Sequence, residues 1–411
     1  MHTIGILMAD VALIIMCARL AGALAVRLGQ PPVLGEIVGG ILLGPTLLGP
    51  VVTSVLFPAD VRSALVPLAD LGLALFMFGV GYELDRRLAT HPAAASIAAG
   101  SMLLPFGLGT ALAAWLAVRH QPADRAAFVL FVGIAVAVTA FPVLSRIVVD
   151  RGMANTRVGG LALSSAALGD VAAWSLLAVV VSMVGGQDPW LLLLALPLLV
   201  MLFAVARPLL ARMLPRCNVS QAMTVLAVGL LLTSAATELL GLHFIFGAFL
   251  FGLICPRHSP EWLKYQAVDR LTSVGGQLLL PVFFVVAGLN LNLRNLDLAA
   301  VGELAALLLV SISGKLAGGY GAARLHRLPG REAGQLAVLM NARGLTEIVV
   351  LTVGLEAGLI DRDLYSLLIV MALVTTAMTG PLLNLLRAER GRETTPSIPA
   401  ASAAAELQRG S

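Results

Sequence analysis

The chain has 411 residues, of which 59% are hydrophobic and 12% are charged, and its mean hydropathy is +0.94. A soluble domain carries roughly a quarter charged residues, so this composition excludes a water-soluble globular protein and indicates a polytopic membrane protein. The formal net charge of +4 does not indicate a nucleic-acid partner, because the arginines lie in the loops between apolar segments. The three cysteines are far apart in the sequence. They indicate neither a metal site nor a disulfide framework, and we expect no cofactor.

Thirteen apolar segments are candidates for membrane-spanning helices, since a helix needs about 20 mainly apolar residues to cross a bilayer. In chain order they are residues 3–26, 33–48, 64–84, 93–117, 126–146, 158–185, 190–211, 220–239, 243–256, 271–289, 298–323, 332–355 and 364–387. The second and the ninth segments are short. The predicted fold class is therefore an all-α polytopic membrane protein with about 13 transmembrane helices.

The basic residues between the segments set the expected orientation. With the N-terminus outside the cell, fifteen Arg and Lys residues fall in the inner loops and five fall in the outer loops, which agrees with the positive-inside rule. The inner ones are Arg27, Arg86, Arg87, Arg146, Arg151, Arg157, Arg207, Arg212, Arg216, Arg257, Lys264, Arg270, Arg324, Arg327 and Arg331; the outer ones are Arg62, Arg119, Arg125, Arg294 and Arg362. We therefore expect a multi-pass protein of the cell membrane with a cytoplasmic C-terminus.

Short motifs recur between the two halves of the chain in the same order. The matched pairs are EIVGGILLGP (36–45) with GAFLFGLICP (247–256), ALFMFGVGYELD (74–85) with PVFFVVAGLNLN (281–292), and VTAFPVL (138–144) with NARGLTE (341–347). The matched segments start seven spans apart, which is an odd number, so two six-helix repeats of opposite topology are predicted. Inverted repeats with broken helices are typical of secondary transporters.

Two of the apolar segments contain residues that interrupt a helix. In the fifth segment Pro142 removes a backbone donor, and we place a break at Ala140, Phe141 and Pro142. In the twelfth segment Asn341 and Gly344 mark a second break. Non-helical backbone at this depth is tolerated only where it is buried in protein or lines a wet cavity, so we expect one of these surroundings at each break.

Charged side chains inside the apolar segments are the candidate functional residues. Asp170 is the only charged residue between positions 161 and 180, and an intramembrane carboxylate is a functional candidate by default. A structural salt bridge is the alternative role. We favour a site for which a proton and a monovalent cation, Na⁺ or K⁺, compete. Thr139, Ser164 and Ser165 are expected to offer oxygen atoms that replace the water of the cation.

The other intramembrane charges each allow two interpretations. Lys315 either neutralises a carboxylate for stability or changes its protonation during transport. Arg343 and Glu347 are four residues apart, so they can pair if their segment is helical, and we expect a mainly structural pair. Glu36 either caps a short helix or lines the ion pathway.

Five stretches carry a resemblance to a known family: LGQPPVLGEIVGGILLGP, TAFPVLSRIVVDRGMANTRVGGLALSSAALGDVAAWSLLA, FIFGAFLFGLICP, LLLPVFFVVAGLNLNL and LMNARGLTEIVVLTVGLEAGLI. Over about residues 5–388 the chain resembles the monovalent cation:proton antiporters of the second branch. These are the relatives of the Kef potassium-efflux systems, bacterial Na⁺/H⁺ antiporters and plant cation/H⁺ exchangers. The resemblance implies the sodium/proton antiporter fold and the exchange of Na⁺ or K⁺ for H⁺ at Asp170, beside two crossed broken helices.

The same resemblance implies a homodimer with two domains in each protomer that move against each other in alternating access. The scaffold or dimerisation domain would comprise residues 1–92 and 220–297, and the transport domain residues 93–189 and 298–388. A linker helix at 190–219 would join them. Residues 389–411 are polar and rich in Pro, Ala and Ser, and we expect a disordered cytoplasmic tail there.

One position departs from the family pattern. Members of the family usually carry Asp, Asn or Gln directly before the ion-binding Asp, whereas this chain has Gly169. Relatives with two acids at these positions tend to be electrogenic, and the lysine that matches Lys315 pairs with the first acid. The missing first acid therefore implies electroneutral exchange of one proton per cation.

Other function classes remain as alternatives. A sodium-coupled symporter of an organic anion would place Arg343 against a carboxylate of its substrate, and a passive cation channel would conduct far faster than a transporter. An intramembrane aspartyl protease is rejected, because its Gly-x-Gly-Asp motif needs Gly where Ala167 stands and the chain contains no Tyr-Asp dipeptide. We therefore do not expect an enzyme.

Overall fold

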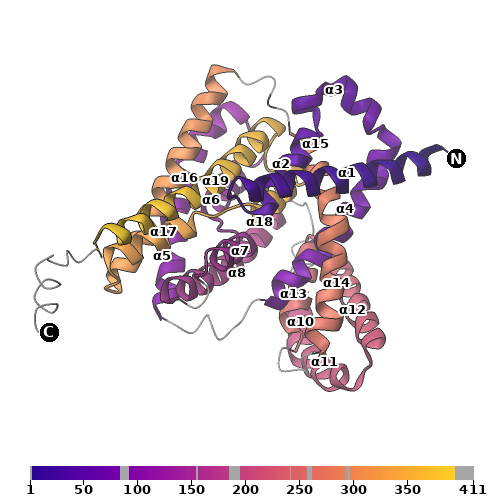
Figure 1. Ribbon diagram of the computed structural model, residues 1–411. Helices are drawn as coiled ribbons and strands as arrows, with labels where there is room; N and C mark the ends of the chain where they lie inside the picture. The colour runs from indigo at the N-terminus through magenta and orange to yellow at the C-terminus, as the bar shows by residue number, and fades with distance from the viewer. Residues whose placement is uncertain are drawn as a thin grey trace, which may run out of the picture.

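In a computed structural model, the chain is all-helical over the residues that the structure describes, which are 2–83, 92–153, 156–184, 195–240, 242–256, 262–291, 293 and 297–393. In chain order the helices are α1 (His2–Arg27), α2 (Pro32–Leu42), α3 (Pro45–Leu56), α4 (Ala59–Glu83), α5 (Pro92–His120), α6 (Arg125–Ala137), α7 (Phe141–Asp150), α8 (Arg157–Val184), α10 (Ala195–Val200), η2 (Met201–Ala206), α11 (Arg207–Met213), η3 (Leu214–Arg216), α12 (Val219–Leu239), α13 (Phe244–Ile254), η4 (Leu263–Val268), α14 (Asp269–Val274), η5 (Gly275–Leu279), α15 (Leu280–Leu289), α16 (Leu298–Leu325), α17 (Gly330–Met340), α18 (Leu345–Glu356) and α19 (Arg362–Glu393). In Figure 1, α5, α16, α17 and α19 lie on the left and α1, α4, α12 and α14 lie on the right.

The apolar segments predicted from the sequence all contain helix in their described parts. Within the described residues, ten helices are long and apolar enough to cross a membrane, and two bent pairs, α2 with α3 and α17 with α18, raise this number to as many as twelve. The ninth predicted segment holds α13, which has 11 residues and is shorter than a span requires. The chain is therefore a multi-pass membrane protein, and the number of thirteen spans stays a prediction.

The helix ends follow from local sequence. Asp124 caps α6, because its side chain accepts hydrogen bonds from the backbone N–H groups of Ala126 and Ala127 at 2.9 and 3.0 Å. Asn218 and Gln221 form a reciprocal capping box at the start of α12. Such caps satisfy backbone donors that an isolated helix end leaves unpaired.

Helices from opposite repeats pack closely against one another. The backbones of α5 and α16 meet at Gly100 and Gly318, where a Cβ added to Gly318 would lie 2.1 Å from the carbonyl oxygen of Gly100. Two further contacts are equivalent to each other in the repeat, which matches α2 with α13 and α4 with α15: α2 packs on α15, and α13 packs on α4. This reciprocal packing is what two inverted repeats require.

The last helix extends further than the sequence suggested. α19 ends at Glu393, so residues 389–393, which we expected to be the start of a disordered tail, are helical. The apolar periodicity ends near residue 387, but a helix can continue through good helix formers such as Ala, Arg and Glu. The rest of the predicted tail lies outside the described residues.

Candidate ion-binding site at the helix crossing

Two interrupted helices cross each other in the interior. Between α6 and α7 the backbone of residues 138–140 is non-helical, and between α17 and α18 residues 341–344 are non-helical. The breaks touch directly, because the backbone N–H of Ala140 donates to the carbonyl oxygen of Ala342 at 3.0 Å. Gly344 has φ of +143°, a conformation that favours glycine. The crossed broken helices expected from the sequence are therefore present.

The first break lies slightly earlier than predicted. Ala140 is non-helical, but Phe141 and Pro142 are the first two residues of α7. Proline is well tolerated there, because a backbone N–H in the first turn of a helix has no partner within that helix. Pro142 thus starts the second half of the span rather than interrupting it. In the second break Asn341 and Gly344 flank the end of α17 and the start of α18, as expected.

Asp170 lies in α8 beside this crossing. Its side chain is 1% exposed, and its carboxylate interacts with the backbone amide of Phe141 at the start of α7. Helix N-termini favour negative charge, because their backbone N–H groups are unpaired and the helix dipole is positive there. The Oδ2 atom of Asp170 is buried and has no hydrogen-bond partner among the described residues, so one carboxylate oxygen is left for a ligand.

Lys315 in α16 is also 1% exposed, and its ammonium group donates a hydrogen bond to the Thr139 hydroxyl oxygen. Thr139 in turn donates to the carbonyl oxygen of Met340 at 2.8 Å, at the C-terminus of α17. No ion pair joins Lys315 to Asp170 among the described residues, which include both. The lysine cation therefore lies near the negative end of a helix and leaves Asp170 unpaired.

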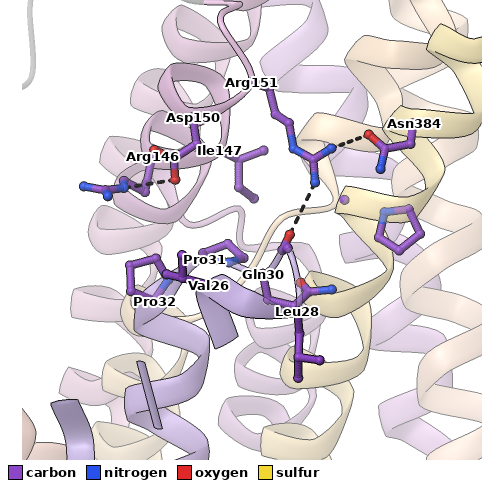
Figure 2. A pocket seen from close by; sticks show the side chains of 13 residues that line it. Val26, Leu28, Gln30, Pro31, Pro32, Arg146, Ile147, Asp150, Arg151 and Asn384 are labelled. Atoms are coloured by element: carbon purple, nitrogen blue, oxygen red, sulfur yellow. Dashed lines mark hydrogen bonds and ion pairs between the residues drawn. The ribbon is translucent and has the colours of Figure 1, made fainter. Parts of the chain in front are cut away.

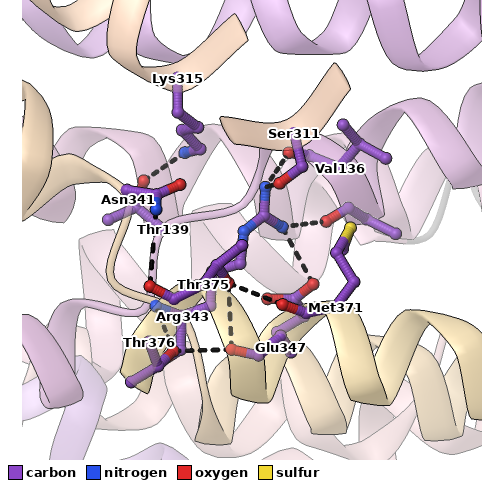
Figure 3. A network of polar contacts seen from close by, with 12 residues as sticks. Val136, Thr139, Ser311, Lys315, Asn341, Arg343, Glu347, Met371, Thr375 and Thr376 are labelled. Carbon is purple, nitrogen blue, oxygen red and sulfur yellow. Dashed lines mark hydrogen bonds and ion pairs between the residues drawn. The ribbon is translucent and has the colours of Figure 1, made fainter. Parts of the chain in front are cut away.

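Arg343 holds the C-terminus of α6. Its Nη1 atom donates to the Ala135 carbonyl oxygen at 2.7 Å and to Glu347 Oε1 at 2.9 Å. Its Nη2 atom donates to the Val136 carbonyl oxygen. Arg343 and Glu347 are both fully buried, and Figure 3 shows their network next to Thr139 and Lys315. The predicted pair is therefore present, although Arg343 itself lies outside α18.

Two supporting hydroxyl groups were not predicted from the sequence. Ser311 accepts a hydrogen bond from Arg343 Nη2 at 2.7 Å. The Thr376 hydroxyl in α19 forms two hydrogen bonds with the backbone of Arg343: it accepts one from the N–H group at 3.0 Å and donates one to the carbonyl oxygen at 2.8 Å. Ser311 is four residues before Lys315, so helical spacing places both on one face of α16, and this spacing was the available signal.

The other predicted site and pathway residues, Ser164, Ser165 and Glu36, have partners of their own, and their roles stay predictions. The Ser165 hydroxyl donates to the Ala94 carbonyl oxygen of α5 at 3.0 Å, and the Ser164 hydroxyl donates to Gly160 within α8 at 2.8 Å. Neither serine is three or four residues from Asp170, the spacing that places side chains on one helix face. Glu36 forms an ion pair with Arg19 at 3.6 Å.

Two large cavities open beside α7. The larger, about 550 Å³, lies between the α1–α2 loop, α7 and α19, and Arg151, Gln30 and Asn384 are among its lining residues (Figure 2). The second, about 470 Å³, is lined by α4, by η4 and α14, and by Pro142. Pro142, which lines the second cavity, follows Phe141, the residue whose amide faces Asp170.

Comparison with known proteins shows which family shares this arrangement. The family described as "Sodium/hydrogen exchanger, transmembrane" matches residues 12–386. The Na(+)/H(+) antiporter NhaS4 of Synechocystis sp. is 34% identical over 93% of this chain and 97% of its own length. Cation/H(+) antiporter 19 of Arabidopsis thaliana is 34% identical over 92% of this chain but 49% of its own length, so the chain spans about half of that relative.

The fold agrees with the sequence match. The sodium proton antiporter MjNhaP1 from Methanocaldococcus jannaschii has a TM-score of 0.65 with 14% identity, over 92% of this chain and 96% of its own. Crossed broken helices, inverted repeats and a family match over most of the chain lead to one conclusion: this chain belongs to the sodium/hydrogen exchanger family.

Proposed function

We propose that the protein exchanges a monovalent cation, Na⁺ or K⁺, for protons across the membrane. The observation that carries this proposal is the unpaired Oδ2 atom of Asp170, in a side chain that is 1% exposed. A charged carboxylate removed from water and left without a partner is costly. It must therefore be neutralised, and either a bound proton or a bound cation can do so.

Competition between these two ligands provides the exchange. When a cation binds Asp170, the proton leaves, and when the proton returns, the cation is released. The Phe141 amide at the start of α7 faces the carboxylate, and helix N-termini favour negative charge. The Thr139 hydroxyl accepts a hydrogen bond from Lys315 and donates one to the Met340 carbonyl oxygen. It is therefore a polar but uncharged group at the first helix break.

A cavity between the two proposed domains is consistent with transport by alternating access. The cavity lined by Pro142 and by α4, η4 and α14 lies between elements of the proposed scaffold domain (1–92 and 220–297) and an element of the proposed transport domain (93–189 and 298–388). Movement of the transport domain would close this cavity and expose Asp170 to the other side. Both Nη atoms of Arg343 are already engaged, which disfavours the alternative in which Arg343 binds an organic carboxylate.

The stoichiometry follows from Gly169. A single carboxylate at this position exchanges one proton for one monovalent cation, so we propose electroneutral transport. No heavy atom lies within 4 Å of a Cβ added at Gly169, so the position has room for a side chain that this sequence does not supply.

Assembly and location are part of the same proposal. We propose a homodimer in the cell membrane with an outer N-terminus and a cytoplasmic C-terminus, as the loop charges indicate. We further propose that the chain has no catalytic activity.

Proton flux in proteoliposomes tests the proposed function. A pH-sensitive dye inside the vesicles should report acidification when they contain the cation at high concentration and are diluted into choline buffer of the same pH, because cations leave and protons enter in exchange. Na⁺ and K⁺ are tested separately. Cation-dependent flux that is insensitive to a valinomycin-clamped potential supports electroneutral exchange. Uptake of a labelled organic anion with Na⁺, or cation flux without proton movement, would contradict it.

A further inference from the structure

A third cavity has a different character from the two beside α7. It is a crevice of about 390 Å³ between α8 on one side and α10, α12 and α13 on the other. Trp174 and Ala178 of α8 and Phe246 and Leu250 of α13 are among its lining residues. This volume falls in the range of about 300–1,000 Å³ that is typical of small-molecule sites.

The hydroxyl groups in the lining are not available to a polar ligand as donors. Ser175 donates to the Val171 carbonyl oxygen at 2.7 Å, and Ser182 donates to the Val179 carbonyl oxygen at 2.6 Å. Thr237 likewise donates to a carbonyl oxygen of its own helix, that of Ser234, at 2.9 Å. All three hydrogens point back to the helix backbone, and the rest of the lining is Val, Trp, Ala, Leu and Phe. The crevice is therefore suited to hydrocarbon rather than to an ion or water.

The crevice also lies next to surface that faces the bilayer. Val179 on its α8 wall is 59% exposed. On α10, beside the opposite wall, Leu196 and Val200 are 66% and 58% exposed. Both walls belong to helices that pass the length and hydropathy test for a membrane span, Arg157–Val184 and Leu196–Arg216. Exposed apolar side chains of such helices contact lipid tails, so hydrocarbon is present where the crevice opens.

We propose that this crevice binds one acyl chain of a membrane phospholipid. An apolar cavity in a protein stays dry and takes up apolar molecules, because its walls otherwise lack partners for dispersion contacts. A flexible acyl chain fits a narrow hollow between helices, whereas a second copy of this chain would need a broad, continuous face.

The position of the crevice gives the bound chain a consequence for the helix that carries Asp170. Val171, the next residue, and Trp174, four residues on, both line it. Trp174 meets Phe246 of α13 edge to face, with ring centroids 6.1 Å apart. The acyl chain would fill the space around this contact and keep water out of the face of α8 next to Asp170. The binding itself does not depend on the proposed function.

Quenching of tryptophan fluorescence by brominated phospholipid tests the proposal. The reporter protein keeps Trp174 as its only tryptophan and carries W115F, W190F and W262F. It is reconstituted in phosphatidylcholine with bromines at the middle of the acyl chain. Trp174 is 4% exposed, and we expect it to lose most of its fluorescence because a bromine-bearing chain lies beside it.

Two further variants separate the crevice from ordinary lipid contact. Ala178→Phe fills the crevice and should restore most of the Trp174 fluorescence, whereas Leu176→Phe, on the exposed face of α8 outside the lining, should leave quenching unchanged. Ser175→Leu is a second filling variant if Ala178→Phe does not fold. Trp174 that stays unquenched in the reporter, or quenching that persists unchanged in a folded filling variant, would overturn the proposal.

Discussion

At the residue level, four ionisable side chains are buried at the helix crossing: Asp170, Lys315, Arg343 and Glu347. Their formal charges sum to zero, but their partners differ. Arg343 and Glu347 are paired with each other, and Lys315 contacts a hydroxyl group. Glu347 also has one oxygen without a hydrogen-bond partner, but its other oxygen is paired with Arg343, whereas Asp170 faces a helix N-terminus and has no ion-pair partner among the described residues. This difference separates the structural charges from the proposed binding group.

Arg343→Met should destabilise the protein strongly. It leaves Glu347 buried without its partner and removes the donors to the end of α6, and breaking one side of a buried pair costs about 3–5 kcal/mol. The double variant Arg343→Met, Glu347→Leu should recover part of this loss, because neither charge remains. Thermal unfolding in detergent measures both. A single variant as stable as the parent would show that the pair has no structural role.

Gly169→Asp should fold and should make exchange respond to membrane potential. The added side chain meets open space, and a second carboxylate next to Asp170 adds a charge to the transported state. Gly169→Asn, which has the same shape without the charge, is the control and should stay electroneutral. Exchange in proteoliposomes under a clamped potential gives the comparison. If the exchange rates of both variants responded equally to membrane potential, the added carboxylate would not be the cause of the response.

At the level of elements, the sequence predicted both helix breaks to within a few residues, from Pro142 for the first and from the Asn341–Gly344 stretch for the second. The sequence did not reveal how the breaks meet, because the bond from Ala140 to Ala342 joins residues from opposite halves. The partner of Ser165 on α8 was also not evident from the sequence, since its hydroxyl donates to the Ala94 carbonyl oxygen of α5. These features depend on tertiary packing, which single-sequence patterns do not encode.

Gly318→Leu should disrupt the contact between α5 and α16. Its Cβ would lie 2.1 Å from the Gly100 carbonyl oxygen, and overpacking in a tight contact typically costs about 1–3 kcal/mol. Gly321→Leu lies one turn further along α16, where an added Cβ meets nothing within 4 Å, and serves as the matched control. The melting temperature should fall for the first variant only. A similar loss for both would point to an effect of glycine replacement itself.

The stabilisation that Asp297 provides at the start of α16 should be lost at acidic pH. The backbone N–H of Ala300 and the side chain of Arg119 hold the pKa of Asp297 below its ordinary value of 3.8. A lowered folded pKa means that the stabilisation is complete above the unfolded value and is lost as pH falls through the folded value. The melting-temperature difference between the parent and Asp297→Ala should therefore shrink as pH falls below 3.8. A difference that is constant with pH would contradict this assignment.

At the level of the whole molecule, hydropathy predicted the membrane class and the long apolar helices, because long apolar runs have one physical solution in a bilayer. It did not predict most of α3 (Pro45–Leu56) or η4 (Leu263–Val268), which lie between the predicted segments. The buried position of Asp170 was also predicted, from its isolation among apolar residues. The number of spans was not settled, because α13 is too short for the length criterion. The polar partners Ser311 and Thr376 were missed, because hydroxyl groups in apolar helices commonly bond their own backbone and give little signal.

The most direct test of the account compares Asp170→Asn with wild type in cation-driven proton exchange, with Na⁺ and K⁺ measured separately. Asp60→Asn is the matched control, since it makes the same chemical change at an exposed carboxylate in the first turn of α4. The account predicts exchange by wild type and by Asp60→Asn and none by Asp170→Asn. Exchange by Asp170→Asn at the wild-type rate would contradict it.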